Sequence, residues 1–178
     1  RVIVRGTAES YESRPAAREA TIRDMLMHTS GLAGLTPSTV VDLYAKNNIR
    51  SVGSSETLAP VMARLGTLPL LADPGAQFIY GVSTDVVGYL CEIFGGMPLD
   101  RFLQERIFEP LQMGDTSFSV APSKLERFAA NYARGNQGQK QYVLYDTPGS
   151  SLWAKPVSYF SGAAGLTSTA TDYMRFCK

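Results

Sequence analysis

The spacing of apolar and polar positions predicts a mainly helical chain. Apolar residues recur at helical spacing in several segments that are bounded by capping residues, Pro or Gly. Helices are expected over Ile22 to His28 with Thr21 as the cap, from Thr36-Pro37 to Asn47-Asn48, from Ser54 or Ser55 through Leu65, from Ser83 or Thr84 to a left-handed stop at Gly95-Gly96, from Pro98 to Phe108, and from Thr169 or Thr171 to Cys177. One or two further helical turns are expected over Pro122 to Phe128.

Short extended patterns add a few strands to these helices. Strands are expected over Arg1 to Val4, Thr116 to Val120, Asn131 to Arg134 and Gln141 to Tyr145, with a polar turn at Gly135 to Gln139 between the last two. Loops are expected over Gly6 to Ala16, Gly31 to Leu35 and Ser161 to Leu166. No repeat, heptad or linker interrupts this order. The pattern therefore predicts one α+β unit over residues 1–178, mainly helical with minor strands.

The rest of the chain is organised around the stretch that leads into the longest apolar helix. Pro74-Gly75 is a turn pair, and residues 77–80 are expected to be short and extended. Tyr80 then lies in a tight turn just before the helix, next to Gly81, with Asp85 in the first helical turn. A tyrosine in such a turn is either a core anchor or a reactive hydroxyl, and the pattern alone favours the anchor.

Composition narrows the classes of partner and cofactor. The 178 residues are 44% hydrophobic and 19% charged, with a net charge of +1. With no cluster of Lys or Arg, this balance argues against nucleic acid or an anionic membrane as a partner. No apolar run approaches the ~20 residues that a bilayer span requires. Cys91 and Cys177 lie in apolar helical patterns; free, buried thiols are expected, with a disulfide between them as the alternative. With the single His28 they make no metal site, and no cofactor is expected.

Generic catalytic motifs are absent or weak. The chain has neither a G-x-S-x-G elbow nor a Gly-rich phosphate loop. Glu105 and Glu109 are expected to lie on a solvated helix face. The imidazole of His28 and the hydroxyls of Thr29 and Ser30 are expected to pin the loop that leaves this helix, and His28 is not expected to serve as a triad base. Trp153 and Tyr159-Phe160 could line an acyl pocket or belong to the core.

Four ordered segments resemble the penicillin-recognising serine hydrolases. This superfamily includes class C β-lactamases, D-alanyl-D-alanine peptidases and β-lactamase-like esterases. The segments are Thr21 to Leu32 (TIRDMLMHTSGL), Pro74 to Tyr80 (PGAQFIY), Phe108 to Thr116 (FEPLQMGDT) and Ser161 to Phe176 (SGAAGLTSTATDYMRF). They are similar to the family patterns TIRDLLxHTSGL, PG-x-x-F-x-Y-S, IFxPLGMxDT and SGGAGLxSTAxDYxRF. Because they span most of the chain, the resemblance implies the helical part of a β-lactamase/transpeptidase-like fold.

The resemblance also implies an acyl-enzyme chemistry. The family acylates a serine in an S-x-x-K motif and uses a nearby tyrosine as the partner base, and Tyr80 matches that tyrosine. A phenol has an unperturbed pKa of about 10. It therefore serves as a base only when a cation stabilises the phenolate, which the S-x-x-K lysine does in the family.

Two departures from the family pattern refine the expectation. The chain contains no S-x-x-K and no K-T-G-like or W-G-G strand, so it is expected to be a central fragment that is inactive alone. Val82 stands where the β-lactamases have an Asn, two residues after the tyrosine, which resembles the esterase branch. The expected substrate is therefore a small-molecule ester or acyl compound. The alternatives are a β-lactamase or D-alanyl peptidase, and a non-catalytic binding or scaffold module. A further expectation is self-association through the apolar face that packs on the α/β region in the family's enzymes, a region that is expected to be absent from this chain.

Overall fold

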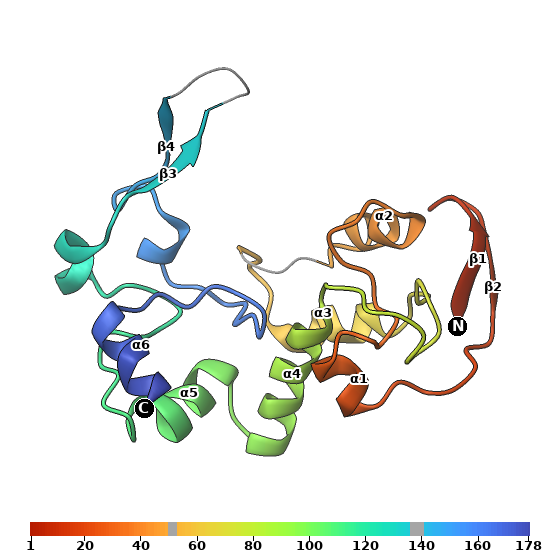
Figure 1. Cartoon of the computed structure of the whole chain (residues 1–178), viewed down its shortest axis with the longest axis horizontal. Helices are drawn as coiled ribbons and strands as arrows, with labels where there is room; N and C mark the ends of the chain where they lie inside the picture. Colours follow the sequence, from red (N-terminus) through yellow and green to blue (C-terminus); the bar gives the residue numbers. More distant parts are fainter. Residues whose placement is uncertain (50–52, 136–140) are drawn as a thin grey trace. The chain divides into compact units, whose positions relative to one another are not determined.

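The computed structural model describes residues 1–49, 53–135 and 141–178, in which the contacts define two compact units (Figure 1). The first unit comprises residues 1–103 and 158–164, and the second comprises residues 104–157 and 165–178. Most of the turn expected at Gly135 to Gln139 lies outside the described residues. The expectation that residues 1–178 behave as a single unit stays a prediction.

The first unit begins with a two-stranded antiparallel sheet. Strand β1 (Val2–Gly6) pairs with β2 (Tyr11–Arg14), which confirms the first expected strand and corrects the loop expected over Gly6 to Ala16. No apolar face marks β2, because three of its four residues are exposed. Backbone pairing and the Arg5–Glu12 ion pair, at 2.8 Å, hold it in place instead. Alternation of apolar residues could not reveal such a strand.

Five helices follow among the described residues of the first unit. They are α1 (Ile22–Leu26), α2 (Thr39–Lys46), α3 (Leu58–Leu65), α4 (Ser83–Gly95) and α5 (Leu99–Leu103). Helices α2 and α3 carry much of the core on their apolar faces, through Val40, Leu43, Tyr44, Leu58, Val61, Met62 and Leu65. Burial of such side chains is the main favourable term in folding. The expected helical fold class is thus confirmed.

Several helix starts differ from the expected ones by one to three residues. Helix α2 is capped by Ser38, whose hydroxyl accepts from the Val41 N–H at 3.3 Å, and not by Thr36. Thr57, rather than Ser54 or Ser55, precedes α3. Val82 precedes α4 without a side-chain cap, so neither Ser83 nor Thr84 is the cap residue. The sequence offered several hydroxyls near each start, and propensity alone does not choose among them.

Helix α1 is shorter than expected because the chain turns left-handed at His28. The helix ends at Leu26, and His28 has φ of 54°. At its start the expected Thr21 cap is confirmed, as part of a capping box with Asp24. Asp24 is buried and also accepts from both guanidinium nitrogens of Arg18, at 2.6 and 2.8 Å. The Arg18 guanidinium holds the pKa of Asp24 well below its usual range.

The second unit combines short helical turns with a hairpin. Its elements are η1 (Gln104–Phe108), η2 (Pro122–Arg127), η3 (Leu152–Ala154), α6 (Ala170–Cys177), and the antiparallel strands β3 (Asn131–Arg134) and β4 (Tyr142–Asp146). The expected helix from Pro98 to Phe108 is present as α5 followed by the π-helical η1. Phe108, Met113 and Phe118 are buried in this unit. The expected cap of the last helix is Thr169, whose hydroxyl accepts from the Asp172 N–H at 3.2 Å.

The strand expected over Thr116 to Val120 does not form. Only Ser117 pairs in an extended manner, through an isolated bridge to Thr167 with N–H···O distances of 3.1 and 2.8 Å. A single bridge is too short to form a strand, so the strand expected from the short extended pattern of this segment is wrong.

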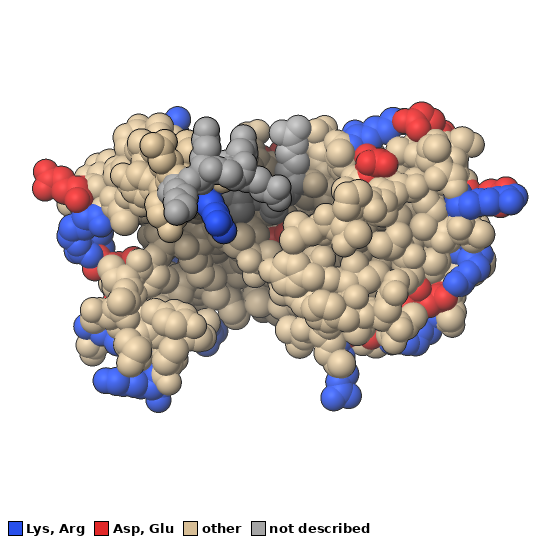
Figure 2. Space-filling view, turned by 45° about the horizontal axis from the view of Figure 1, so that its top comes forward, with Lys and Arg blue, Asp and Glu red and all other residues tan. Residues whose placement is uncertain are grey.

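The two cysteines differ in their exposure to solvent. Both are free, but Cys91 is half-buried and Cys177 is exposed, so the expected burial is wrong for Cys177. Helix α6 exposes Tyr173, Met174 and Phe176; the expected self-association stays a prediction. On the face in Figure 2, basic and acidic side chains are interspersed in small groups. Within the described residues, no helix is both long and apolar enough to cross a membrane.

One ion pair predicts how stability depends on pH. Arg14 bonds to Asp73, and with the Ala17 N–H at 2.8 Å it lowers the pKa of Asp73 from 3.8 to about 2. This carboxylate therefore contributes stability above pH 3.8 that is lost as pH falls toward 2. We expect Asp73→Asn to flatten the fall in melting temperature over that range. Asp42→Asn, which removes an exposed carboxylate from α2, is the control and should leave the slope unchanged; an equal slope in wild type and Asp73→Asn would contradict the assignment.

Candidate active site

Tyr80 presents its phenol at the surface, in the turn that precedes α4. Its side chain is 56% exposed, and that of Phe78, two residues earlier, is 67% exposed. Gly75, with φ of 85°, makes the turn that starts this segment. An exposed tyrosine is not a core anchor. Of the two roles that the sequence left open for Tyr80, the structure therefore excludes the anchor.

Two glycines allow the Tyr80 turn to lie directly against the loop that follows α1. Gly34 and Gly81 form an isolated antiparallel bridge. A Cβ atom on Gly34 would lie 1.7 Å from the carbonyl oxygen of Tyr80, and one on Gly81 would lie 2.4 Å from the carbonyl oxygen of Ala33. Neither position has room for a side chain. The two segments approach as closely as backbones can.

Further backbone hydrogen bonds join the same two segments before the turn. The Ile79 N–H donates to the His28 carbonyl at 2.7 Å, and the Gly75 N–H donates to the Thr29 carbonyl at 2.7 Å. The Leu71 N–H donates to the Gly31 carbonyl at 2.7 Å. Residues 71–81 are thus joined to residues 28–34 at four separate points.

The first residue of α4 is tied to that loop through buried hydroxyls. The Ser83 and Ser30 Oγ atoms lie 2.8 Å apart, and both residues are buried. The Ser30 Oγ also accepts from the Leu32 N–H at 3.2 Å. Buried hydroxyls are costly unless they are paired, so this contact fixes both segments in one arrangement.

The third residue of α4 holds a second loop. Asp85 is buried, and its Oδ1 accepts from the Ser161 hydroxyl at 2.5 Å. Burial raises the pKa of this carboxyl, and the Ser161 hydroxyl and the nearby backbone N–H groups of Ala163 and Gly162 oppose that rise. Gly162 packs so closely on α4 that a Cβ atom there would lie 2.1 Å from the Thr84 carbonyl oxygen. We call Ser83, Asp85 and their partners Ser30 and Ser161 the α4 hub.

His28 packs its imidazole against the aromatic side chains of this turn. Its ring centroid lies 4.8 Å from that of Tyr80 and 5.6 Å from that of Phe78. Its buried Nδ1 atom has no hydrogen-bond partner within the part of the chain that the structure describes. The expected pinning of the loop is therefore confirmed for the hydroxyls, through Ser30 and through Thr29, which donates to Asp24 at 3.1 Å. The imidazole contributes ring contacts instead.

The aromatic residues considered for an acyl pocket separate into different environments. Tyr159 is buried, and burial raises the pKa of its phenol. In the second unit, the Trp153 Nε1–H donates to the Gly165 carbonyl at 2.8 Å. Tyr159 therefore belongs to the core of the first unit, and Trp153 has a structural hydrogen bond.

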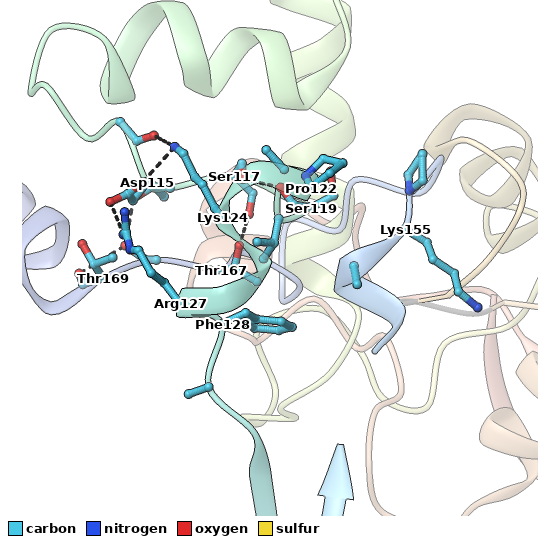
Figure 3. Close-up of a pocket in the computed structure, with 18 of the residues that line it drawn as sticks. Asp115, Ser117, Ser119, Pro122, Lys124, Arg127, Phe128, Lys155, Thr167 and Thr169 are labelled. Carbon is cyan, nitrogen blue, oxygen red and sulfur yellow. Dashed lines mark hydrogen bonds and ion pairs between the residues drawn. The ribbon is translucent and has the colours of Figure 1, made fainter. Parts of the chain in front are cut away.

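A cavity of about 650 Å³ lies within the second unit and was not anticipated from the sequence (Figure 3). Asp115 is paired there with Lys124 at 2.8 Å and with Arg127 at 2.5 Å, and these partners lower its pKa to about 2. Figure 3 shows the Lys155 side chain directed away from this cluster. Both cations are thus paired with the one carboxylate of Asp115, and the cluster keeps a net positive charge. Among the described residues, no group of three or more His, Cys, Asp or Glu side chains could hold a metal ion.

The close approach at Gly34 makes a direct stability prediction. We expect Gly34→Ala to destabilise the fold by about 1–3 kcal/mol, because the new methyl group would force the Tyr80 carbonyl aside. Gly114→Ala is the matched control, since a Cβ there meets nothing within 4 Å. Thermal denaturation of both variants is the measurement. A Gly34→Ala protein as stable as Gly114→Ala would show that the two segments do not lie this close.

Comparisons with known proteins agree with this architecture. The family model described as Beta-lactamase matches residues 9–178. The chain is 32% identical over 167 residues to Protein Rv1367c of Mycobacterium tuberculosis, covering 93% of this chain and 40% of that protein. It is 34% identical over 165 residues to monacolin J acid methylbutanoyltransferase of Aspergillus terreus, covering 87% of this chain and 36% of that protein.

A solved structure gives the same result. The chain resembles EstCE1, described as a hydrolase with promiscuous acyltransferase activity, with a TM-score of 0.69 and 25% identity over 88% of this chain and 44% of that one. The chain therefore spans between 36% and 44% of the length of these three proteins. The expected family resemblance is confirmed: this chain belongs to the beta-lactamase family.

Proposed function

We propose that the protein carrying this chain is a serine acyl hydrolase or acyl transferase, and that Tyr80 is its general base. The observation that carries the proposal is the phenol of Tyr80, which is 56% exposed on a turn whose backbone is bonded to the loop after α1. A general base must reach a substrate while its own position stays fixed. The names of the relatives, a methylbutanoyltransferase and a hydrolase with acyltransferase activity, support the same class of reaction.

The proposed reaction passes through an acyl-enzyme. The Tyr80 phenolate takes the proton of a serine hydroxyl while the serine oxygen bonds to the ester carbonyl carbon. The tetrahedral intermediate then expels the alkoxide, which takes the proton from the Tyr80 phenol. Water or a second alcohol attacks the acyl-serine in the same manner, and the choice between them separates hydrolysis from transfer.

The nucleophile is proposed to come from sequence other than these residues. No S-x-x-K occurs among the 178 residues, and the phenolate form of Tyr80 requires a nearby cation. On this proposal the chain supplies the base and its support, while an S-x-x-K segment supplies serine and lysine. The chain alone is then inactive.

The residue two positions after Tyr80 favours esters over β-lactams. Val82 is apolar and half-buried, and it offers no amide to a lactam side chain. Faster turnover of p-nitrophenyl butyrate than of a chromogenic cephalosporin would support the ester class. The reverse order would favour the β-lactamase or D-alanyl peptidase alternative, and no turnover of either would favour a binding module.

The role of Tyr80 is tested by removing one oxygen atom. In a protein that contains this segment together with an S-x-x-K motif, we expect Tyr80→Phe to lower kcat/KM for p-nitrophenyl butyrate about 100-fold or more. The control is Tyr132→Phe, which removes the hydroxyl of an exposed tyrosine on β3. A Tyr80→Phe protein within a few-fold of wild type would contradict the assignment.

A further inference from the structure

His28 has a backbone conformation that most residues avoid. Its φ of 54° places it in the left-handed region, directly after α1. Side chains with a Cβ rarely adopt this conformation, and among non-glycine residues Asn, Asp and His are the ones enriched there. Gly or Asn would satisfy the turn at lower cost. The backbone therefore explains why Phe or Tyr is unfavourable at this position, but it does not explain why a ring is present.

The ring is explained by what it touches. The imidazole lies tilted at 37° against Tyr80, with 4.8 Å between centroids, and meets Phe78 edge to face at 5.6 Å. Both partners are largely exposed, so this contact adds little to the buried core. The His28 carbonyl oxygen also accepts from the Ile79 N–H at 2.7 Å. Because Ile79 adjoins Tyr80 in the sequence, this bond holds the backbone that carries the Tyr80 ring next to the backbone that carries the imidazole.

The imidazole is not held by a hydrogen bond at its buried nitrogen. Nδ1 is buried and has no partner among the described residues, and a buried polar atom left unpaired carries a desolvation cost. Two costly features, the left-handed backbone and the unpaired nitrogen, thus meet at a residue whose ring contacts that of Tyr80. Local rules of this kind are broken mainly at functional sites.

We infer that His28 is a positioning residue for Tyr80, a planar ring tolerated in a left-handed turn that seats the phenol in one orientation. This inference rests on the proposed role of Tyr80 as general base. Histidine satisfies both requirements at once, because asparagine supplies only the backbone tolerance and phenylalanine supplies only the ring. The two requirements can therefore be separated by substitution.

The experiment uses two variants of the chain and two readouts. His28→Asn keeps the left-handed turn and removes the ring, whereas His28→Phe keeps a ring and strains the turn. Tyrosines are labelled with ¹³C at the ring Cε positions, and the Tyr80 signal among the nine tyrosines is assigned by Tyr80→Phe. The Tyr80 chemical shift reports ring contact, and thermal denaturation reports stability.

We expect each variant to change a different readout. His28→Phe should keep the Tyr80 signal displaced as in wild type but melt at a lower temperature than His28→Asn. His28→Asn should move the Tyr80 signal toward that of an exposed tyrosine while it retains wild-type stability. A Tyr80 signal that is unchanged in His28→Asn, or lost equally in both variants, would overturn the inference.

Activity separates this inference from the proposed function. In a protein that also contains S-x-x-K, His28→Asn should lower kcat for p-nitrophenyl butyrate about tenfold or more with KM little changed, because small misplacements of a base are costly. His28→Phe, which keeps a ring at this position, should retain most of the wild-type kcat. If Tyr80→Phe is itself fully active, the proposed function fails, while the Tyr80 signal still tests whether His28 seats the ring. If Tyr80→Phe is inactive and His28→Asn is fully active, the positioning role alone fails.

Discussion

The candidate site depends on two buried side-chain contacts at the first turn of α4. Ser83 meets Ser30 at 2.8 Å and Asp85 accepts from Ser161 at 2.5 Å, so one helical turn holds loops that lie far apart in the sequence. Tyr80 lies only three residues before Ser83, so the contacts that hold Ser83 also restrict the position of the Tyr80 backbone. Polar contacts in a low-dielectric interior are strong when paired and costly when broken. Separating either pair of the α4 hub would therefore leave buried polar groups without a partner. The exposed phenol is thereby attached to a fixed support.

Local sequence signals predicted much of the secondary structure. The Thr21 cap, the left-handed stop at Gly96 and the Thr169 cap all act within a few residues, and each is present. Elements whose stability comes from elsewhere were missed or misplaced. Strand β2 has no apolar face, and the Thr116 to Val120 segment finds a partner only at Ser117.

The site itself was only partly accessible to sequence analysis. The family resemblance singled out Tyr80, and the turn chemistry placed it correctly before a helix. The hub was not predictable, because Ser30 and Ser83 are 53 residues apart and Asp85 and Ser161 are 76 residues apart. The left-handed turn at His28 was hidden as well, since an apolar helical pattern continued up to it. Gly34 and Gly81 could have been suspected as positions of close approach, but nothing local identifies them as each other's partners.

On the proposed function, this chain supplies the tyrosine base of a serine acyl-enzyme site whose nucleophile lies in other sequence. The first measurement to make is intact mass after incubation with a fluorophosphonate, which labels activated serines. We expect no adduct on the 178-residue chain and a single adduct, on the S-x-x-K serine, when this segment is joined to that motif. A stoichiometric adduct on the 178-residue chain would rule this assignment out, because it would place a working nucleophile among these residues.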